Sequence, residues 1–200
     1  MKSDESFSDQ LERWLRGDAS KTLGTLSDVF AEKSFAVMIL LMMFVPAIPL
    51  PTGAITYLFE VITLVLTTQM VLGRRVLWLP DRWRHHELGT MTTGKAIPFV
   101  VRRVRWFERH SRPRWARLFE QRWFLRLLGL VLTAFALAAI IAPPFSGLDT
   151  FPAVGAVLVA LAIVLEDFLI LLIGIAIGTG GVVLILTIGV ALVRVVRHLV

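Results

Sequence analysis

The sequence has no cysteine, four histidines and a single tyrosine among its 200 residues. Without cysteine, the chain can form neither a disulfide nor a thiolate metal site. The histidines are widely separated except for His85 and His86, so no group of residues has the spacing of a metal site. A glycine-rich phosphate loop and a triad-like order of Ser, His and Asp are also missing. We therefore expect no metal, no cofactor and no catalytic residue, and we do not expect an enzyme.

Charged residues are almost missing from two long stretches, 34–73 and 127–165. Hydrophobic residues make up 56% of the chain, against roughly 45–50% in soluble domains. A helix needs about 20 apolar residues to cross a bilayer, and each stretch is nearly twice that long. The composition therefore indicates an all-α integral membrane protein of the size of one compact domain.

Prolines interrupt both stretches, three of them between residues 46 and 51 and two more at Pro143 and Pro144. Proline lacks an N–H and clashes with the preceding turn, so neither stretch can be one continuous helix. The backbone carbonyls freed at such a break need a partner from the protein or from a water-lined cavity. Each stretch is therefore either a hairpin of two short spans or a pair of re-entrant helices.

The two stretches resemble each other. A shift of 93 residues places Pro51 on Pro144, and both stretches then share the order apolar helix, proline break, apolar helix, charged pair. Such repeats often hold an ion or a substrate where their broken helices meet, although two hairpins that merely turn the chain would give the same pattern. The expected fold is two proline-broken helical-hairpin repeats joined by an amphipathic interfacial linker. Its expected parts are N-terminal cytosolic or interfacial helices (1–33), membrane repeat 1 (34–73), the basic linker (74–126), and membrane repeat 2 with a C-terminal helix (127–200).

The linker is strongly basic, with fourteen Lys and Arg against four Asp and Glu, and it holds five of the six tryptophans. Basic segments beside spans stay in the cytoplasm, and Trp prefers the headgroup level. Val100, Val104 and Phe107 have the spacing of one helix face, which predicts a helix lying in the interface plane. Anionic lipid headgroups are the expected partner. Nucleic acid is not expected, because apolar stretches flank the linker on both sides.

The two ends of the chain give further expectations. Residues 1–33 lack a short apolar core after a basic start, so we expect a multi-pass chain inserted by its own helices, with a cytosolic N-terminus. Gly174 and Gly178 form a GxxxG pattern, which lets helices pack closely within one subunit or in a homodimer. The last apolar run, 168–193, either crosses the membrane once or turns back at its glycines.

Four residues are candidates for a substrate or ion pathway: Pro51, Glu60, Pro144 and Asp149. Glu60 lies seven residues into an otherwise apolar helix, where a charge is costly unless it is paired or hydrated. Asp149 follows the second break, and the two prolines shape the breaks. The alternatives are an interfacial carboxylate at Glu60 and an ordinary loop residue at Asp149.

Two charged pairs follow the broken helices, Arg74 with Arg75 and Glu166 with Asp167. If both hairpins begin and end in the cytoplasm, these four residues share one face of the membrane domain. We therefore predict that they are cytosolic, and that the acidic pair caps a turn and contacts the basic pair.

Four parts of the sequence carry a family resemblance: residues 22–35, 46–51, 69–80, and the later group of 144–145, 152 and 165–167. Their order and spacing, over about residues 10–180, resemble the ExoD family of bacterial exopolysaccharide-synthesis membrane proteins. The resemblance fails at Glu60, where we expect the family to have Gly, and at Glu166-Asp167, where an expected central Arg is missing. It implies a bacterial inner-membrane protein associated with exopolysaccharide production, and it supplies no catalytic residue.

Two functions stay open at this point. One is a small transporter or ion-pathway protein, with a homodimer as a candidate assembly, in which the two proline breaks meet near the midplane and Glu60 and Asp149 carry charge. The other is a non-transporting accessory protein that scaffolds polysaccharide synthesis or export components through its linker helices. A membrane enzyme acting on lipid-linked sugars is a third reading, for which the chain has no catalytic cluster. Water access at Pro51 and Pro144 separates the first two, because a transport site must be wet from at least one side.

Overall fold

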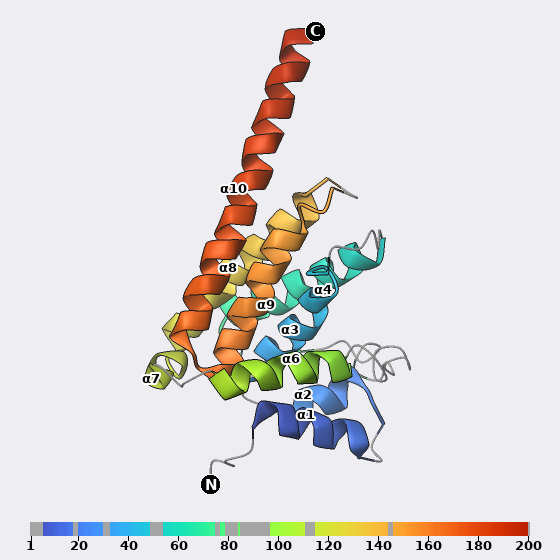
Figure 1. Ribbon diagram of the computed structural model, residues 1–200, viewed down its shortest axis with the longest axis vertical. Helices are drawn as coiled ribbons and strands as arrows, with labels where there is room; N and C mark the ends of the chain where they lie inside the picture. Colours follow the sequence, from blue (N-terminus) through green and yellow to red (C-terminus); the bar gives the residue numbers. More distant parts are fainter. Residues whose placement is uncertain are drawn as a thin grey trace.

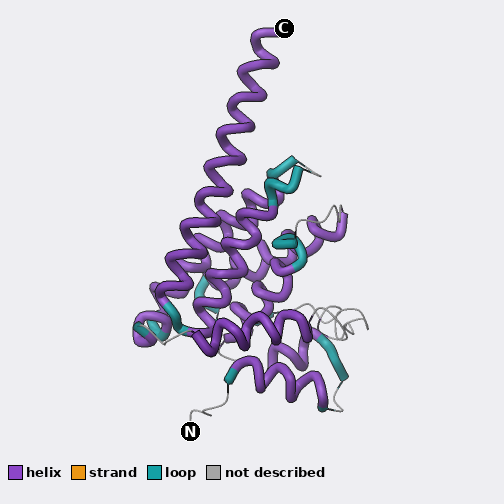
Figure 2. The backbone as a smooth tube through the Cα atoms, viewed as in Figure 1, coloured by secondary structure: helices purple, strands orange, loops and turns teal. Residues whose placement is uncertain are grey.

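The computed structural model describes residues 6–17, 20–29, 33–48, 54–74, 77–78, 84, 97–110, 115–143 and 146–199. These residues form helices and contain no β-strand (Figures 1 and 2). The helices are α1 (Phe7–Arg16), α2 (Leu23–Val29), α3 (Ser34–Phe44), α4 (Ala54–Val71), α6 (Ile97–His110), α7 (Ala116–Phe119), α8 (Arg122–Ile141), α9 (Thr150–Leu165) and α10 (Phe168–Leu199). The all-helical class predicted from composition is confirmed for this part of the chain.

The apolar helices α3, α4, α8, α9 and α10 form one bundle (Figure 1). Helix α3 packs against α4 and α9, α4 packs against α8, and α8 packs against α9. Helix α3 ends at Phe44, two residues before Pro46, and α8 ends at Ile141, two residues before Pro143. These ends fit the rule that a helix stops before a proline. Pro51 and Pro144 lie outside the described residues.

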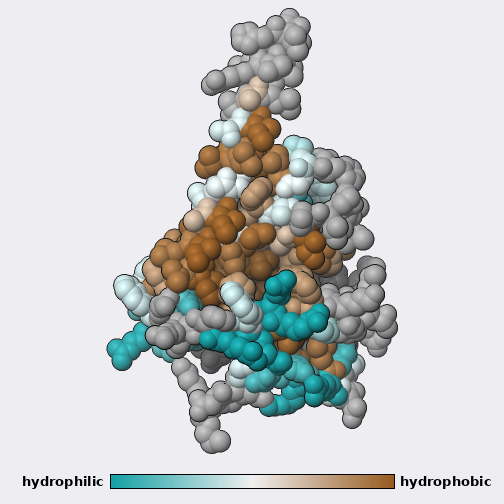
Figure 3. All heavy atoms as spheres, in the orientation of Figure 1, coloured by the Kyte–Doolittle hydropathy of each residue, from teal (hydrophilic) through white to brown (hydrophobic). Residues whose placement is uncertain are grey.

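Helices α1, α2 and α6 lie together at one end of the bundle, which we call the polar cap (Figure 1). Apolar side chains join its helices: Leu11 and Trp14 of α1 are buried, and so are Val100 and Val104 of α6. The spacing of these residues gives each helix one apolar face. Hydrophilic atoms gather over this end of the molecule, whereas the middle of the bundle is apolar (Figure 3).

Ion pairs fix α1 on α6 at the edge of the polar cap. The Arg105 guanidinium contacts Glu12 Oε2 at 2.5 Å and Asp9 Oδ1 at 3.3 Å. Ser8 donates from its backbone N–H to Glu108 Oε1 at 2.9 Å. These contacts join residues nearly a hundred positions apart, so they fold the N-terminal helix onto the linker helix.

The bundle exposes an apolar exterior. Helix α8 and residues 168–189 of α10 are long and apolar enough to cross a membrane, yet only 44% and 33% of their apolar windows are buried. A core helix of a soluble protein would be mostly buried. Instead, α10 leaves Leu169, Leu172, Val183 and Leu186 between 49% and 61% exposed. Apolar surface of this extent is what a helix presents to lipid, and it covers much of the face shown in Figure 3.

Glycines allow α9 and α10 to pack closely. A Cβ atom on Gly155 of α9 would overlap the Cα of Gly178 on α10, and one on Gly174 would lie 2.9 Å from the backbone N of Val159. The GxxxG pattern is therefore used inside one subunit, which was one of its two expected roles. Helix α10 is continuous from Phe168 to Leu199, so the alternative of a return at its glycines is wrong. Glycine permits close helix contact and does not break a helix surrounded by packing partners.

The close α9–α10 contact gives a test with a matched control. Gly155→Ala places a methyl group against the backbone of α10, where nothing flexible can move aside, so we expect a loss of about 1–3 kcal/mol. Gly180→Ala lies on the same helix pair, has nothing within 4 Å of the added Cβ, and removes a poor helix former, so it should be neutral or stabilising. Thermal unfolding of both purified variants in detergent measures the difference. Equal melting temperatures would contradict the close packing.

The ion pairs of the polar cap give a pH test. The hydrogen bond from Arg105, followed by the charge of Arg16, lowers the pKa of Glu12 below its ordinary value of 4.5. A lowered pKa means that the stabilisation is fully present above pH 4.5 and is lost as the pH falls through the folded-state pKa. We expect Glu12→Gln to be less stable than the wild type at pH 7, and this difference to shrink as the pH falls through the lowered folded-state pKa of Glu12. The measurement is the thermal midpoint of both proteins from pH 7 to pH 3. A difference in midpoint that stays the same over this range would refute the stabilising role of the Glu12 charge.

Candidate functional site

Glu60 is the most unusual side chain of the bundle. It sits in the apolar helix α4, it is 1% exposed, and its Oε2 has no hydrogen-bond partner among the described residues. A buried carboxylate oxygen without a partner is costly, so such residues are rare where function does not need them.

Asp149 lies close enough to Glu60 for its charge to act on that carboxyl group. It directly precedes α9, and its side chain does not cap the helix. The structure thus brings together two of the four predicted pathway residues, which come from different hairpins and are 89 positions apart in the sequence. The other two, Pro51 and Pro144, lie outside the described residues.

A stripe of buried polar side chains continues from Glu60 along α4. Thr56, Glu60, Thr63 and Thr67 follow one another at intervals of four, three and four residues, and each is at most 8% exposed. This spacing places them on one face of the helix, and α4 packs against α3 and α8. We call these four residues the polar stripe. The sequence analysis missed the threonines, although their helical spacing was visible in the sequence.

The threonines of the polar stripe differ from Glu60 in how they are satisfied. Thr63 donates to the Phe59 carbonyl at 2.8 Å, and Thr67 donates to the Leu64 carbonyl at 3.1 Å. A threonine can satisfy its hydroxyl group within its own helix, but a glutamate cannot satisfy a carboxylate in this way. A carboxyl group in apolar surroundings, with a second carboxylate acting on it by charge alone, can take up a proton or a cation. This is the chemistry available to Glu60 and Asp149.

The predicted charged pairs lie at the opposite ends of these helices. Glu166 pairs with Lys33, at 2.8 Å between Nζ and Oε1, rather than with Arg74. Asp167 Oδ1 accepts a hydrogen bond from the Leu169 backbone N–H at 2.9 Å, which caps the start of α10. Arg74 is exposed, and Arg75 lies outside the described residues. The prediction that the acidic pair caps a turn holds for Asp167. The basic partner of Glu166 is Lys33, and not the predicted Arg74.

Two cations lie at helix ends that correspond to each other under the shift of 93 residues. Lys33, just before α3, donates to the Val164 carbonyl at the end of α9, at 2.8 Å. Arg126, near the start of α8, places its guanidinium against Gly73 at the end of α4. Lys33 and Arg126 are separated by 93 positions, as are Gly73 and Glu166. Gly73 and Glu166 both have left-handed backbones, with φ of 74° and 56°.

Within the described residues, the bundle and its apolar exterior are those of an all-helical, membrane-associated protein, with two helices long and apolar enough to cross a bilayer. The sequence model of the exopolysaccharide-synthesis family ExoD matches residues 7–187. The chain therefore belongs to the ExoD family, as its motif order predicted, and this family is associated with exopolysaccharide synthesis.

A relative from Synechocystis sp., described as uncharacterized protein slr1875, is 27% identical over 142 residues. The match covers 70% of this chain and 65% of the relative, so it spans somewhat less than two thirds of that protein's length. No solved structure matches the fold.

Proposed function

We propose that the protein is a multi-pass membrane protein that provides an ion pathway in support of exopolysaccharide synthesis. The observation that carries the proposal is the buried Glu60 carboxylate, which belongs to the polar stripe of α4 and is influenced by the charge of Asp149 from the other hairpin. A charged side chain persists at such a place where a proton or cation must be taken up and released. We place the protein in the bacterial plasma membrane with a cytosolic N-terminus, and we assign it no enzymatic reaction.

We further propose that the two hairpins are an internal duplication, which would favour a pathway where they meet. In the first hairpin α3 packs against α4, and in the second α8 packs against α9. Between the hairpins, α4 packs against α8, and in the corresponding way α9 packs against α3. The four helices therefore pack in a pattern that is unchanged when the two hairpins are exchanged. The same shift of 93 residues relates Lys33 to Arg126 and Glu166 to Gly73, and each cation lies against the residue with a left-handed backbone beyond a helix end. Transporters built from repeats place their ion sites where the repeats meet. In our proposal, Pro51 and Pro144 shape the two breaks beside this site.

The polar stripe supplies the remaining polar groups of the proposed pathway. Thr63 and Thr67 lie one and two turns beyond Glu60 on the buried face of α4. Their hydroxyl groups already donate to their own helix, which leaves their oxygen lone pairs to accept from water or to contact a cation. The polar stripe therefore places weak oxygen ligands along α4 on the C-terminal side of the Glu60 carboxylate.

Ion flux in proteoliposomes tests the pathway. Wild-type protein should carry protons or sodium ions under an imposed gradient, and Glu60→Gln, which keeps the shape but cannot change charge, should lower the flux at least tenfold. Glu60→Gln should also unfold at an equal or higher temperature, because it removes a buried charge. Glu120→Gln makes the same chemical change at an exposed position outside the bundle, so its flux should equal that of the wild type.

The outcomes separate the two functions. Loss of flux in Glu60→Gln, with Glu120→Gln unaffected and both proteins folded, supports the pathway, and Asp149→Asn should then lower flux as well. Wild-type protein that carries neither ion under any gradient would refute the pathway. The scaffold function would then remain, and the polar cap, with exposed Trp106 on α6, is the surface that would bind a partner.

The proposed topology can be tested cleanly because the natural chain has no cysteine. A single cysteine at Arg74 lies just after the first hairpin, and one at Glu120 lies just before the second. A single cysteine at Ser146 lies in the exposed turn between α8 and α9. Membrane-impermeant maleimide added to intact cells should label only Ser146→Cys, and the other two should react after the membrane is opened. Labelling of all three cysteines from outside would contradict the topology. In a separate experiment, single cysteines at Pro51 and Pro144 would report whether water reaches the two proline breaks.

A further inference from the structure

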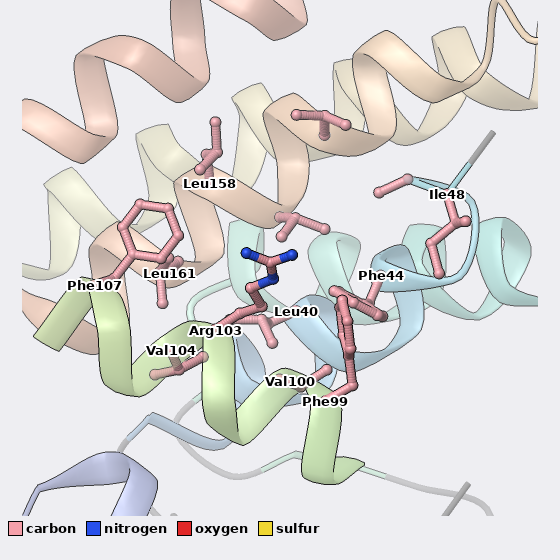
Figure 4. A pocket seen from close by; sticks show the side chains of 13 residues that line it. Leu40, Phe44, Ile48, Phe99, Val100, Arg103, Val104, Phe107, Leu158 and Leu161 are labelled. Carbon is pink, nitrogen blue, oxygen red and sulfur yellow. The ribbon is translucent and has the colours of Figure 1, made fainter. Parts of the chain in front are cut away.

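A pocket lies between the linker helix α6 and the bundle helices α3 and α9, with a volume of about 320 Å³ (Figure 4). It is separate from the polar stripe, because no residue of α4 lines it. Its volume is at the lower end of the range for sites that bind small molecules, roughly 300–1,000 Å³. Apart from one residue, its lining is made only of aliphatic and aromatic side chains.

The exception is Arg103 of α6. Its guanidinium points from α6 into the pocket, toward α9 (Figure 4). It lies 5.2 Å from the centre of the Phe99 ring, which in turn contacts Phe44 of α3. Within the described part of the chain, no carboxylate pairs with Arg103. The neighbouring Arg105 does have such partners, since it contacts Glu12 and Asp9.

We propose that this pocket binds an anionic phospholipid, with its phosphate on Arg103 and one acyl chain between α3 and α9. Charge complementarity identifies the headgroup, because a guanidinium binds phosphate through two parallel hydrogen bonds. The apolar walls identify the rest of the ligand, since a free phosphate ion would gain nothing from Leu40, Val157 or Leu161.

The position of the pocket fits the same ligand. Helix α6 is amphipathic and belongs to the polar cap, whereas α3 and α9 belong to the apolar bundle. A pocket between such elements lies where lipid headgroups meet acyl chains, and basic pockets of this kind bind anionic lipids. The proposal rests on membrane association and does not depend on the ion pathway at Glu60.

Lipid retention by the purified protein tests the proposal. Protein delipidated in detergent is mixed with phosphatidylglycerol or phosphatidylcholine, and bound lipid is counted by native mass spectrometry. We expect tighter binding of phosphatidylglycerol, and in Arg103→Gln a loss of this preference of about fivefold, the effect of one well-placed cation. Arg102→Gln removes the same charge from an adjacent exposed position that does not line the pocket, and it should bind like the wild type.

A second variant tests the acyl chain independently of charge. Val157→Trp fills the pocket and leaves Arg103 in place, so it should lose both lipids while the thermal midpoint shows that the protein is folded. Equal effects of Arg102→Gln and Arg103→Gln would overturn the proposal in favour of a diffuse basic surface. Full competition by glycerol phosphate, with no effect of Val157→Trp, would overturn it in favour of a soluble anion.

Discussion

The need to satisfy polar groups in apolar surroundings governs this structure more than any single packing contact. The last carbonyls of a helix have no partner within the helix, and the bundle meets this need with side chains brought from elsewhere. Lys33 donates to Val164 at the end of α9 and pairs with Glu166 beyond it. A cation at a helix C-terminus is favourable for the helix dipole as well. One residue thereby closes α9 and anchors the start of α3, which ties the first hairpin to the second.

The same requirement explains why Glu60 stands apart. On its face of α4, the hydroxyl groups of Thr63 and Thr67 bond within their own helix, and Glu166 and Asp167 have ionic and backbone partners. Against this background, a carboxylate oxygen with no partner in the described chain is an exception. Asp149, the charged group that acts on it, carries the same sign, so it does not compensate a charge on Glu60. A proton or a cation is the compensation that chemistry allows.

Much of this arrangement followed from the sequence, and the reasons for the rest are specific. The positions of the prolines predicted where α3 and α8 end, and the spacing of apolar residues predicted the buried faces of α1 and α6. Both predictions were possible because they depend only on residues that are close together in the sequence. The proximity of Glu60 and Asp149 depends on how two hairpins pack, and an apolar sequence carries little information about which helix faces which. The pairing of Glu166 with Lys33 was missed for the same reason. The continuity of α10 was ambiguous because glycine serves both close packing and helix breaks.

The length of α3 bears on where the proposed pathway lies. With 11 residues, α3 rises about 16 Å, which is roughly half of a 30 Å hydrocarbon core. Its first residue adjoins Lys33, which is held at the end of α9, and α2 of the polar cap packs against α3. If the cap lies at the headgroup level, the other end of α3 reaches only the middle of the bilayer. Pro46, two residues beyond this end, then lies at a depth where backbone carbonyls most need partners.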